Sequence, residues 1–171
     1  MKKIVALILT LLLISTTYAE VRVVDTLETR NNVAYAVGED KGFSGKLIGN
    51  SVWPVIEKIQ TNYKDGVKEG LHTSWHSNGQ KHFEIHYING ATNGMFVSWY
   101  KNGKKEYELN HTNGKRNGLQ TLWSINGQKK AQINYTNNQK NGLYTLWYSN
   151  GQKASESNYT NGQRNGLYTS W

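Results

Sequence analysis

Four of the five histidines of the chain fall in one short stretch, at His72, His76, His82 and His86. Imidazole nitrogens and carboxylate oxygens are common zinc ligands, and Glu84 stands among these rings. In a hairpin with all four rings on one face, His82 lies diagonal to His72 and His76, and Glu84 lies opposite His72. The candidate metal set is therefore His72, His76, His82 and Glu84. The simpler interpretation is exposed polar side chains, because equivalent positions elsewhere hold other polar residues. We therefore expect no metal and no cofactor.

Other residues that could do chemistry are not arranged for catalysis. The chain has no cysteine. Its pattern contains no serine, histidine and aspartate group, no phosphate-cradling loop and no isolated carboxylate pair. Glu84, Glu108 and Glu156 recur at one position beside lysines, which indicates a solvated row of charges. The sequence therefore predicts a protein that is not an enzyme.

The elements that carry these residues repeat every 24 residues. Five tryptophans mark the period, and a glycine stands five residues before each of them. The tryptophans are Trp75, Trp99, Trp123, Trp147 and Trp171, and the glycines are Gly70, Gly94, Gly118, Gly142 and Gly166. A period of this length indicates one small unit that buries its apolar face only against its neighbours. We expect the tryptophans to be structural.

Turn signals within each period predict β-hairpins. Asn-Gly recurs three residues after a tryptophan, as at Asn78–Gly79, and a second turn follows at positions such as Asn89–Gly90. Apolar and polar residues alternate between the turns, as in half-buried strands. The expected fold is all-β, an elongated single-layer antiparallel meander of repeated hairpins over residues 63–171.

The alternation also predicts which residues share a face. A three-residue loop at residues 77–79, a type I turn with a glycine bulge, pairs Trp75 with Lys81 and Thr73 with Phe83. Phe83 then lies on the same face as Trp75, and Lys81 lays its stem on an indole ring. The glycine that precedes each tryptophan would leave room for an aromatic ring of the neighbouring hairpin.

The face opposite the tryptophans becomes aromatic toward the C-terminus, and we expect it to contact a partner. The candidate residues are Tyr100, Leu122, Tyr144, Leu146, Tyr148 and Tyr168. The alternative is that this face is covered by a segment that contains Val52, Trp53, Val55, Ile56 and Ile59. The last strand, residues 166–171, has no return strand in this sequence. We therefore expect self-association or strand addition at the edge of this strand, unless the sequence is a truncated copy of a longer array.

The N-terminal residues have the pattern of an export signal. Two lysines precede an apolar run, Ile4 to Ile14, and a small residue, Ala19, marks a cleavage site. The run is too short for a membrane-spanning helix. We expect residues 1–19 to be a signal peptide and the protein to be exported to the periplasm or cell surface. Residues 20–62 are then an entry segment with a divergent capping repeat.

A basic excess limits the class of partner. The formal charge is +8, and removing the two lysines of residues 1–19 leaves 18 basic and 12 acidic side chains, a charge of +6. Such an excess favours anionic partners, although it is also common on solvated surfaces. An exported chain seldom meets nucleic acid, so we expect no nucleic-acid partner. The charge is compatible with peripheral contact with a membrane or cell wall.

The repeat unit resembles a known family. Its pattern, Asn-Gly-x-x-x-Gly-Leu-x-Thr-x-Trp-Tyr-x-Asn-Gly-x-Lys, is similar to the bacterial MORN repeat variant found in the YwqK family of antitoxins. Residues 38–46 resemble the entry segment of such arrays, with Gly42 where a proline is common. The resemblance implies a hairpin array without an active site, used for protein assembly, membrane association or neutralising a partner.

These observations together predict an exported, non-enzymatic repeat protein that binds another protein of the cell envelope or a secreted protein. One alternative is an antitoxin-like neutraliser of a partner toxin. Another is a carbohydrate- or cell-wall-binding protein, because rows of exposed tyrosine and tryptophan can stack on sugar rings.

Overall fold

The computed structural model describes residues 22–50 and 58–171. The expected signal peptide and the candidate covering residues Val52, Trp53, Val55 and Ile56 lie outside the described residues. Every regular element in the described part is a strand: β1 (Val23–Val24), β2 (Leu27–Arg30), β3 (Val33–Ala36), β4 (Gly45–Asn50), β5 (Lys58–Lys64), β6 (Val67–Trp75), β7 (Lys81–Ile88), β8 (Ala91–Thr92), β9 (Gly94–Trp99), β10 (Lys105–Thr112), β11 (Lys115–Arg116), β12 (Gly118–Trp123), β13 (Lys129–Thr136), β14 (Gln139–Trp147), β15 (Lys153–Thr160) and β16 (Gln163–Ser170).

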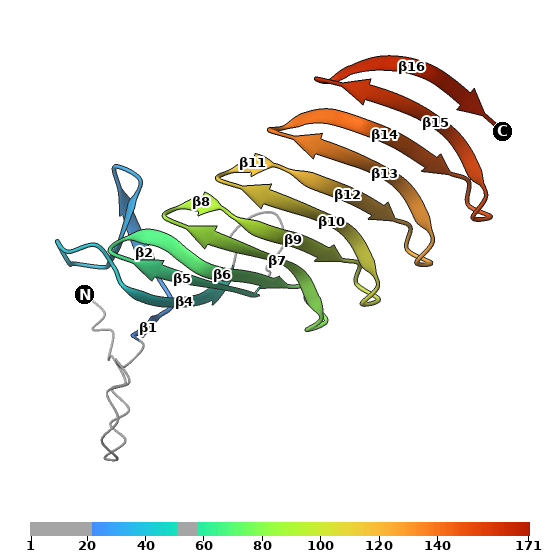
Figure 1. The fold of residues 1–171 in the computed structure, drawn as a ribbon. Coiled ribbons are helices and arrows are strands. Elements are labelled where there is room, and N and C mark those ends of the chain that lie inside the picture. Colours follow the sequence, from blue (N-terminus) through green and yellow to red (C-terminus); the bar gives the residue numbers. More distant parts are fainter. Residues whose placement is uncertain (1–21, 51–57) are drawn as a thin grey trace, which may run out of the picture.

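One sheet of 14 strands runs the length of the array (Figure 1). From β4 to β16 the long strands follow one another in chain order and are antiparallel, with β8 paired to β7 and β11 paired to β10. At its start, β1 pairs in parallel with β4, and β2 and β3 form a separate hairpin. The predicted all-β meander of hairpins is therefore confirmed. No helix in the described residues is long and apolar enough to cross a membrane.

Two kinds of turn alternate along the array. At the first, the Gly79 N–H donates to the His76 carbonyl at 2.9 Å and the His76 N–H donates to the Gln80 carbonyl at 2.8 Å. Gly79 has φ +83°, so the predicted three-residue loop with a glycine bulge is confirmed. At the second turn, Asn89 and Gly90 have φ +48° and +79°, the backbone of a two-residue type I′ hairpin.

A second bulge in each hairpin changes which residues share a face. Trp75 pairs with Lys81, as predicted, but Ser74 pairs with Phe83, so the register shifts by one residue between the two pairs. A one-residue shift moves all following side chains to the other face. The prediction that Phe83 lies on the face of Trp75 is therefore wrong. The same shift recurs in the next three hairpins.

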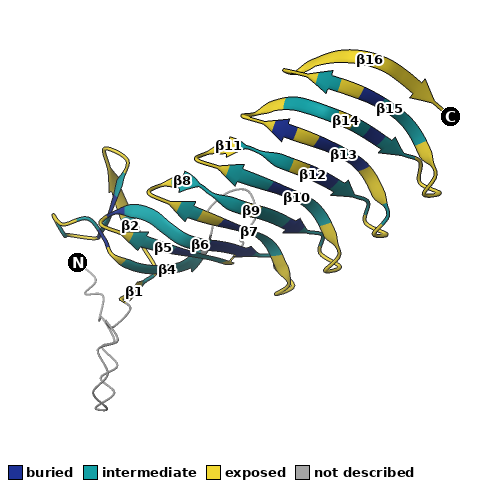
Figure 2. Ribbon diagram, in the orientation of Figure 1, coloured by how far each residue is buried: buried dark blue, intermediate teal, exposed yellow. Residues whose placement is uncertain are grey.

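The bulges leave the sheet with two distinct faces. The tryptophan face carries the tryptophans with residues such as Thr73 and Glu84, which pair directly. The apolar face carries the main apolar cluster, in which Leu109 and Ile133 are each 1% exposed and Tyr135 is buried. Three further rings pack against this cluster, Tyr107, Tyr144 and Tyr159. Burial is concentrated in the middle of the strands, while the turns and β16 are exposed (Figure 2).

The glycine five residues before each tryptophan has a backbone conformation with positive φ. Gly118 has φ +103°, which side chains rarely adopt. A Cβ on it would meet only the Asn110 Cβ at 3.6 Å, an ordinary contact. The expected close approach of an aromatic ring is therefore not what the structure shows. The same positive φ recurs at Gly70, Gly94, Gly142 and Gly166.

Lysines join successive hairpins on the tryptophan face. The Lys81 Nζ lies 5.7 Å from the ring centre of Trp99, the tryptophan of the next hairpin, and also 2.6 Å from the Glu84 carboxylate. Lys58, Lys105, Lys129 and Lys153 stack in the same way on the tryptophans that follow them. Each cation–π contact at such exposed sites contributes about 0.5 to 1 kcal/mol. Each of the five tryptophans thus contacts a lysine of the preceding hairpin or strand.

Candidate functional site

The histidine cluster is not assembled as a metal centre. The bulge places Glu84 opposite Thr73 on the tryptophan face, whereas His72 pairs with Ile85 on the apolar face. The prediction that Glu84 lies opposite His72 is wrong for this reason. His86 pairs with Leu71 and so also lies on the tryptophan face. Among the described residues, no group of three His, Cys, Asp or Glu side chains could hold a metal ion.

The other histidines of this stretch make structural contacts. The His76 Nε2 lies 2.7 Å from the Trp99 carbonyl oxygen, and its ring centre lies 4.4 Å from that of His82. The His72 Nδ1 lies 2.5 Å from the Thr61 hydroxyl. At the positions of His72 and His76, later hairpins have phenylalanine, glutamine, tyrosine or serine. In the first hairpin the two imidazoles connect neighbouring strands.

His72 is expected to make the protein less stable in acid. Burial, and after it the charge of the nearby Lys68, lower the pKa of His72 to about 4. A histidine in the unfolded chain has a pKa of about 6.5, so the unfolded state binds the proton first. The contribution is present above pH 6.5 and is lost as the pH falls toward 4. We expect a loss of roughly 1 to 2 kcal/mol, below the full linkage value because solvent screens part of the ring.

Urea unfolding at pH 7 and pH 4.5 measures this effect. The matched variant is His72→Gln, since Gln120 occupies the equivalent buried position two repeats later. The variant should lose less stability than the natural chain between the two pH values. Equal losses in the two proteins would show that His72 is not the responsible group.

All six candidate partner-binding residues lie on or beside the apolar face. Leu122 and Leu146 pair with Ala131 in the sheet, and Tyr144 pairs with Ile133. Tyr168 pairs with Ser157 in β15 and is 52% exposed. Tyr100 and Tyr148 follow Trp99 and Trp147 at the three-residue turns. This face also holds the buried cluster. The alternation of residue types had predicted that the core and the six candidates lie on opposite faces.

Two of these six residues also join hairpins to one another. The Tyr100 hydroxyl donates to the Trp123 carbonyl at 2.9 Å, and the Tyr148 hydroxyl donates to the Trp171 carbonyl at 2.7 Å. We expect Tyr100→Phe to lower the free energy of unfolding by about 0.5 to 1.5 kcal/mol, because the variant loses this hydrogen bond. Urea unfolding checks this, with Tyr35→Phe outside the array as control. A Tyr100→Phe variant as stable as the natural chain would contradict the structural role.

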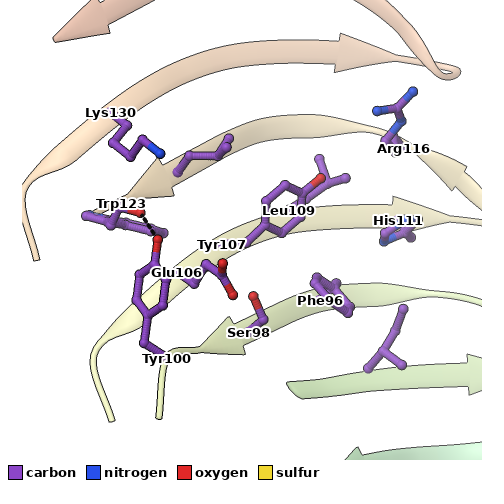
Figure 3. Close-up of a pocket in the computed structure, with 12 residues that line it drawn as sticks. Phe96, Ser98, Tyr100, Glu106, Tyr107, Leu109, His111, Arg116, Trp123 and Lys130 are labelled. Carbon is purple, nitrogen blue, oxygen red and sulfur yellow. Dashed lines mark hydrogen bonds between the residues drawn. The ribbon is translucent and has the colours of Figure 1, made fainter. Parts of the chain in front are cut away.

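A groove of about 570 Å³ opens on the apolar face over the second and third hairpins (Figure 3). Its apolar lining comes from strands β7 to β12 and includes Ile85, Phe96, Tyr107, Leu109 and Leu122. Arg116 and His111 lie at one end, and Glu106, Lys130 and Tyr100 lie at the other. A volume of this size is typical of sites that hold a small molecule or several side chains of a partner.

The end of the groove near His111 is built around Arg116. Its guanidinium lies 4.4 Å from the ring centre of Tyr135, and Arg116 pairs with His111 in the sheet. Burial, and then the Arg116 charge, lower the pKa of His111, which keeps this ring neutral. The His111 Nδ1 is buried without a hydrogen-bond partner. This end therefore offers a fixed cation beside an unsatisfied ring nitrogen, at the edge of an apolar surface.

Sequence reasoning missed most of the groove. It placed Phe83 on the tryptophan face, and with it every second residue of the same strand, including Ile85 of the groove. One sequence signal pointed to the true arrangement: Lys81 and Glu84, three residues apart, can meet on one face of a strand only across a bulge.

Comparison with protein families matches the MORN repeat variant at residues 68–89, 92–113 and 140–161. The first match begins in β6 and ends in the type I′ turn after β7, and the other two span the equivalent parts of their hairpins. No curated protein matches the chain. Between the second and third matches, β12 and β13 form a hairpin with the same bulge. The chain is therefore a β-hairpin repeat protein in which three of the hairpins match the MORN repeat variant.

Proposed function

We propose that this chain is an exported, non-enzymatic repeat protein that binds another protein of the cell envelope through the apolar face of its array. The groove carries this proposal. It combines apolar and aromatic walls with an arginine at its edge, the composition that favours the centre of protein–protein interfaces. A neutraliser of a toxin would use the same surface, with the toxin as its partner.

A protein ligand fits this array better than a carbohydrate. Sugar rings stack on open aromatic faces, and here a lysine lies over each of the five tryptophans of the repeat. The apolar groove instead suits aliphatic and aromatic side chains, whose burial contributes roughly 25 cal/mol per Å² of apolar surface.

Site-specific photocrosslinking in the cell of origin tests the binding face. Phe96 lines the groove, and its chain neighbour Met95 is 45% exposed on the tryptophan face. Replacing Phe96 by p-benzoylphenylalanine should give a discrete, protease-sensitive adduct on irradiation, whereas the same replacement at Met95 should not. Equal adducts at both positions, or none at Phe96, would contradict binding through the groove.

Export is tested on the mature N-terminus. The sequence pattern supports cleavage after Ala19, so the protein isolated from the envelope should begin Glu20-Val21-Arg22 in N-terminal sequencing. Replacing Leu11 by arginine should interrupt the apolar run and retain the uncleaved chain in the cytoplasm. An unprocessed chain that starts at Met1 in the envelope would contradict a cleaved signal.

A further inference from the structure

The excess of basic over acidic side chains in residues 20–171 lies in the C-terminal part. Residues 20–108 contain 11 basic and 11 acidic side chains, so this part is formally neutral. Residues 109–171 contain seven basic side chains and one acidic side chain, a formal charge of +6. The basic excess therefore lies on the hairpins from β10 onward, and its placement there decides what it can bind.

Three of these cations occupy the same position in successive hairpins. Arg116 pairs with His111, Lys140 with Tyr135 and Arg164 with Tyr159. Residues directly opposite each other in antiparallel strands share a face, so all three cations lie on the apolar face, near the type I′ turns. These three residues are called the cation row below. Its first member, Arg116, lies at one end of the groove.

Tyrosine rings and turn hydrogen bonds hold the cation row in place. The Arg116 Cζ lies 4.4 Å from the Tyr135 ring centre, and the Lys140 Nζ lies 5.1 Å from that of Tyr159. The Arg116 carbonyl accepts from the Asn138 N–H of the next turn at 3.0 Å, and the Lys140 carbonyl accepts from the Gly162 N–H at 2.9 Å. These bonds fix successive cations two strands apart, about 9 to 10 Å.

The cation row lacks internal counter-charges. Within the described ranges, no carboxylate forms an ion pair with its three members. On the tryptophan face, by contrast, three lysines have ion pairs: Lys81 with Glu84, Lys105 with Glu108 and Lys153 with Glu156. The single acidic residue after position 108, Glu156, is engaged by Lys153 on that other face. The three cations therefore present their charge to a ligand.

The spacing and the groove together select the ligand chemistry. A polyproline II segment rises 3.1 Å per residue with three residues per turn, so acidic residues at every third position stand about 9.3 Å apart on one side. Its other residues can place apolar side chains in the groove beside Arg116. A phosphate or sulfate polymer could match the charges but would leave the apolar groove unfilled.

We infer that the cation row binds an extended acidic segment of the partner protein, with carboxylates at every third residue and apolar side chains in the adjoining groove. This inference rests on the proposed function, because it specifies the partner of the same face. The Arg116 and Arg164 guanidinium groups can each donate two parallel hydrogen bonds to a carboxylate.

A designed peptide tests the inference without knowledge of the partner. The probe is a fluorescein-labelled peptide of five Glu-Pro-Leu units, titrated with the purified protein and followed by fluorescence anisotropy at 50 mM NaCl. We expect saturable binding that weakens at 300 mM NaCl. The triple variant Arg116→Gln, Lys140→Gln, Arg164→Gln should bind at least tenfold more weakly, and a peptide of five Gln-Pro-Leu units should lose a similar factor.

A matched triple variant controls for total charge. Lys41→Gln, Lys101→Gln and Lys104→Gln remove the same charge from exposed positions away from the cation row, and should change affinity less than twofold. The single variant Arg164→Gln, at an exposed position, keeps the test valid if the row triple unfolds, and should weaken binding about threefold.

Several results would overturn the inference. They are equal binding of the neutral peptide, an equal loss in the control triple, unchanged affinity in Arg164→Gln, or stronger competition by polyphosphate than by unlabelled peptide at equal charge. The crosslink at Phe96 separates this failure from failure of the proposed function. If the Phe96 adduct persists unchanged in the triple variant of the cation row, the chain binds a protein through the groove. The cation row then does not select an acidic segment of that protein.

Discussion

Replacing Leu109 by alanine is expected to lower the free energy of unfolding by about 2 to 5 kcal/mol, the range for buried leucines. Leu109 is 1% exposed and packs with Ile133 and Tyr135 on the apolar face. In a single-layer sheet, neighbours along the array provide this burial. Removing the side chain therefore weakens the contacts between two hairpins as well as those within one. Equilibrium unfolding in urea measures the change.

Leu119→Ala is the matched control for this prediction. Leu119 has the same side chain and lies in the adjacent hairpin strand, but it is 49% exposed. Its truncation should cost less than about 1 kcal/mol, as most surface substitutions do. Comparable losses in the two variants would contradict the assignment of the main core to the apolar face.

Replacing Gly118 by asparagine is expected to lower the free energy of unfolding by roughly 1 to 3 kcal/mol, the cost of holding a side-chain-bearing residue in a sparsely populated backbone region. Gly118 has φ +103° where β12 begins, and no steric obstacle explains the glycine. The cost is therefore one of backbone conformation. Urea unfolding or thermal unfolding followed by circular dichroism measures it.

Gly114→Asn tests the same substitution four residues earlier, in the type I′ turn. Gly114 has φ +77°, and a Cβ on it would have no atom within 4 Å. The chain itself places Asn138, with φ +70°, at the equivalent turn position. Asparagine tolerates this left-handed region, so the cost should stay below about 1 kcal/mol. A greater loss of unfolding free energy at Gly114 than at Gly118 would contradict this explanation, since it assigns the larger backbone cost to Gly118.

The prediction for Leu109 follows from the way the array is built. Each hairpin is stabilised in part by its contacts with the next hairpin, as in other repeat proteins. The lysine–tryptophan contacts, the hydroxyl hydrogen bonds of Tyr100 and Tyr148, and the bond from the Gly114 N–H to the Thr92 carbonyl at a type I′ turn cross from one repeat to the next. A change that shifts one hairpin is therefore felt by its neighbours.

Local features of the fold could be predicted from residue types. Asn78–Gly79 and Asn89–Gly90 demand positive φ, so their spacing located both turns, and the 24-residue period established the meander. The pairing of Trp75 with Lys81 was also correct, because the three-residue loop determines it. These features depend on contacts between residues close in sequence, which residue types report directly.

The face assignment failed one residue further along the hairpin. An extra residue in β7 shifts the register after Lys81. A prediction that assumes strict alternation of faces along a strand does not allow for such a bulge. The candidate metal set failed with it, because Glu84 moved to the opposite face from His72. The candidate tyrosines were placed on a separate contact face, yet they share the face of the buried core.

The sequence by itself determined the repeat, the hairpins, the positions of both turns and the type of the first, because each depends on local backbone preferences. Only the tertiary structure decided which face holds the core, where the groove opens, and that Arg116, Lys140 and Arg164 form one row beside it. Those features depend on register, and a single bulged residue exchanges the faces of the residues that follow it in its own strand.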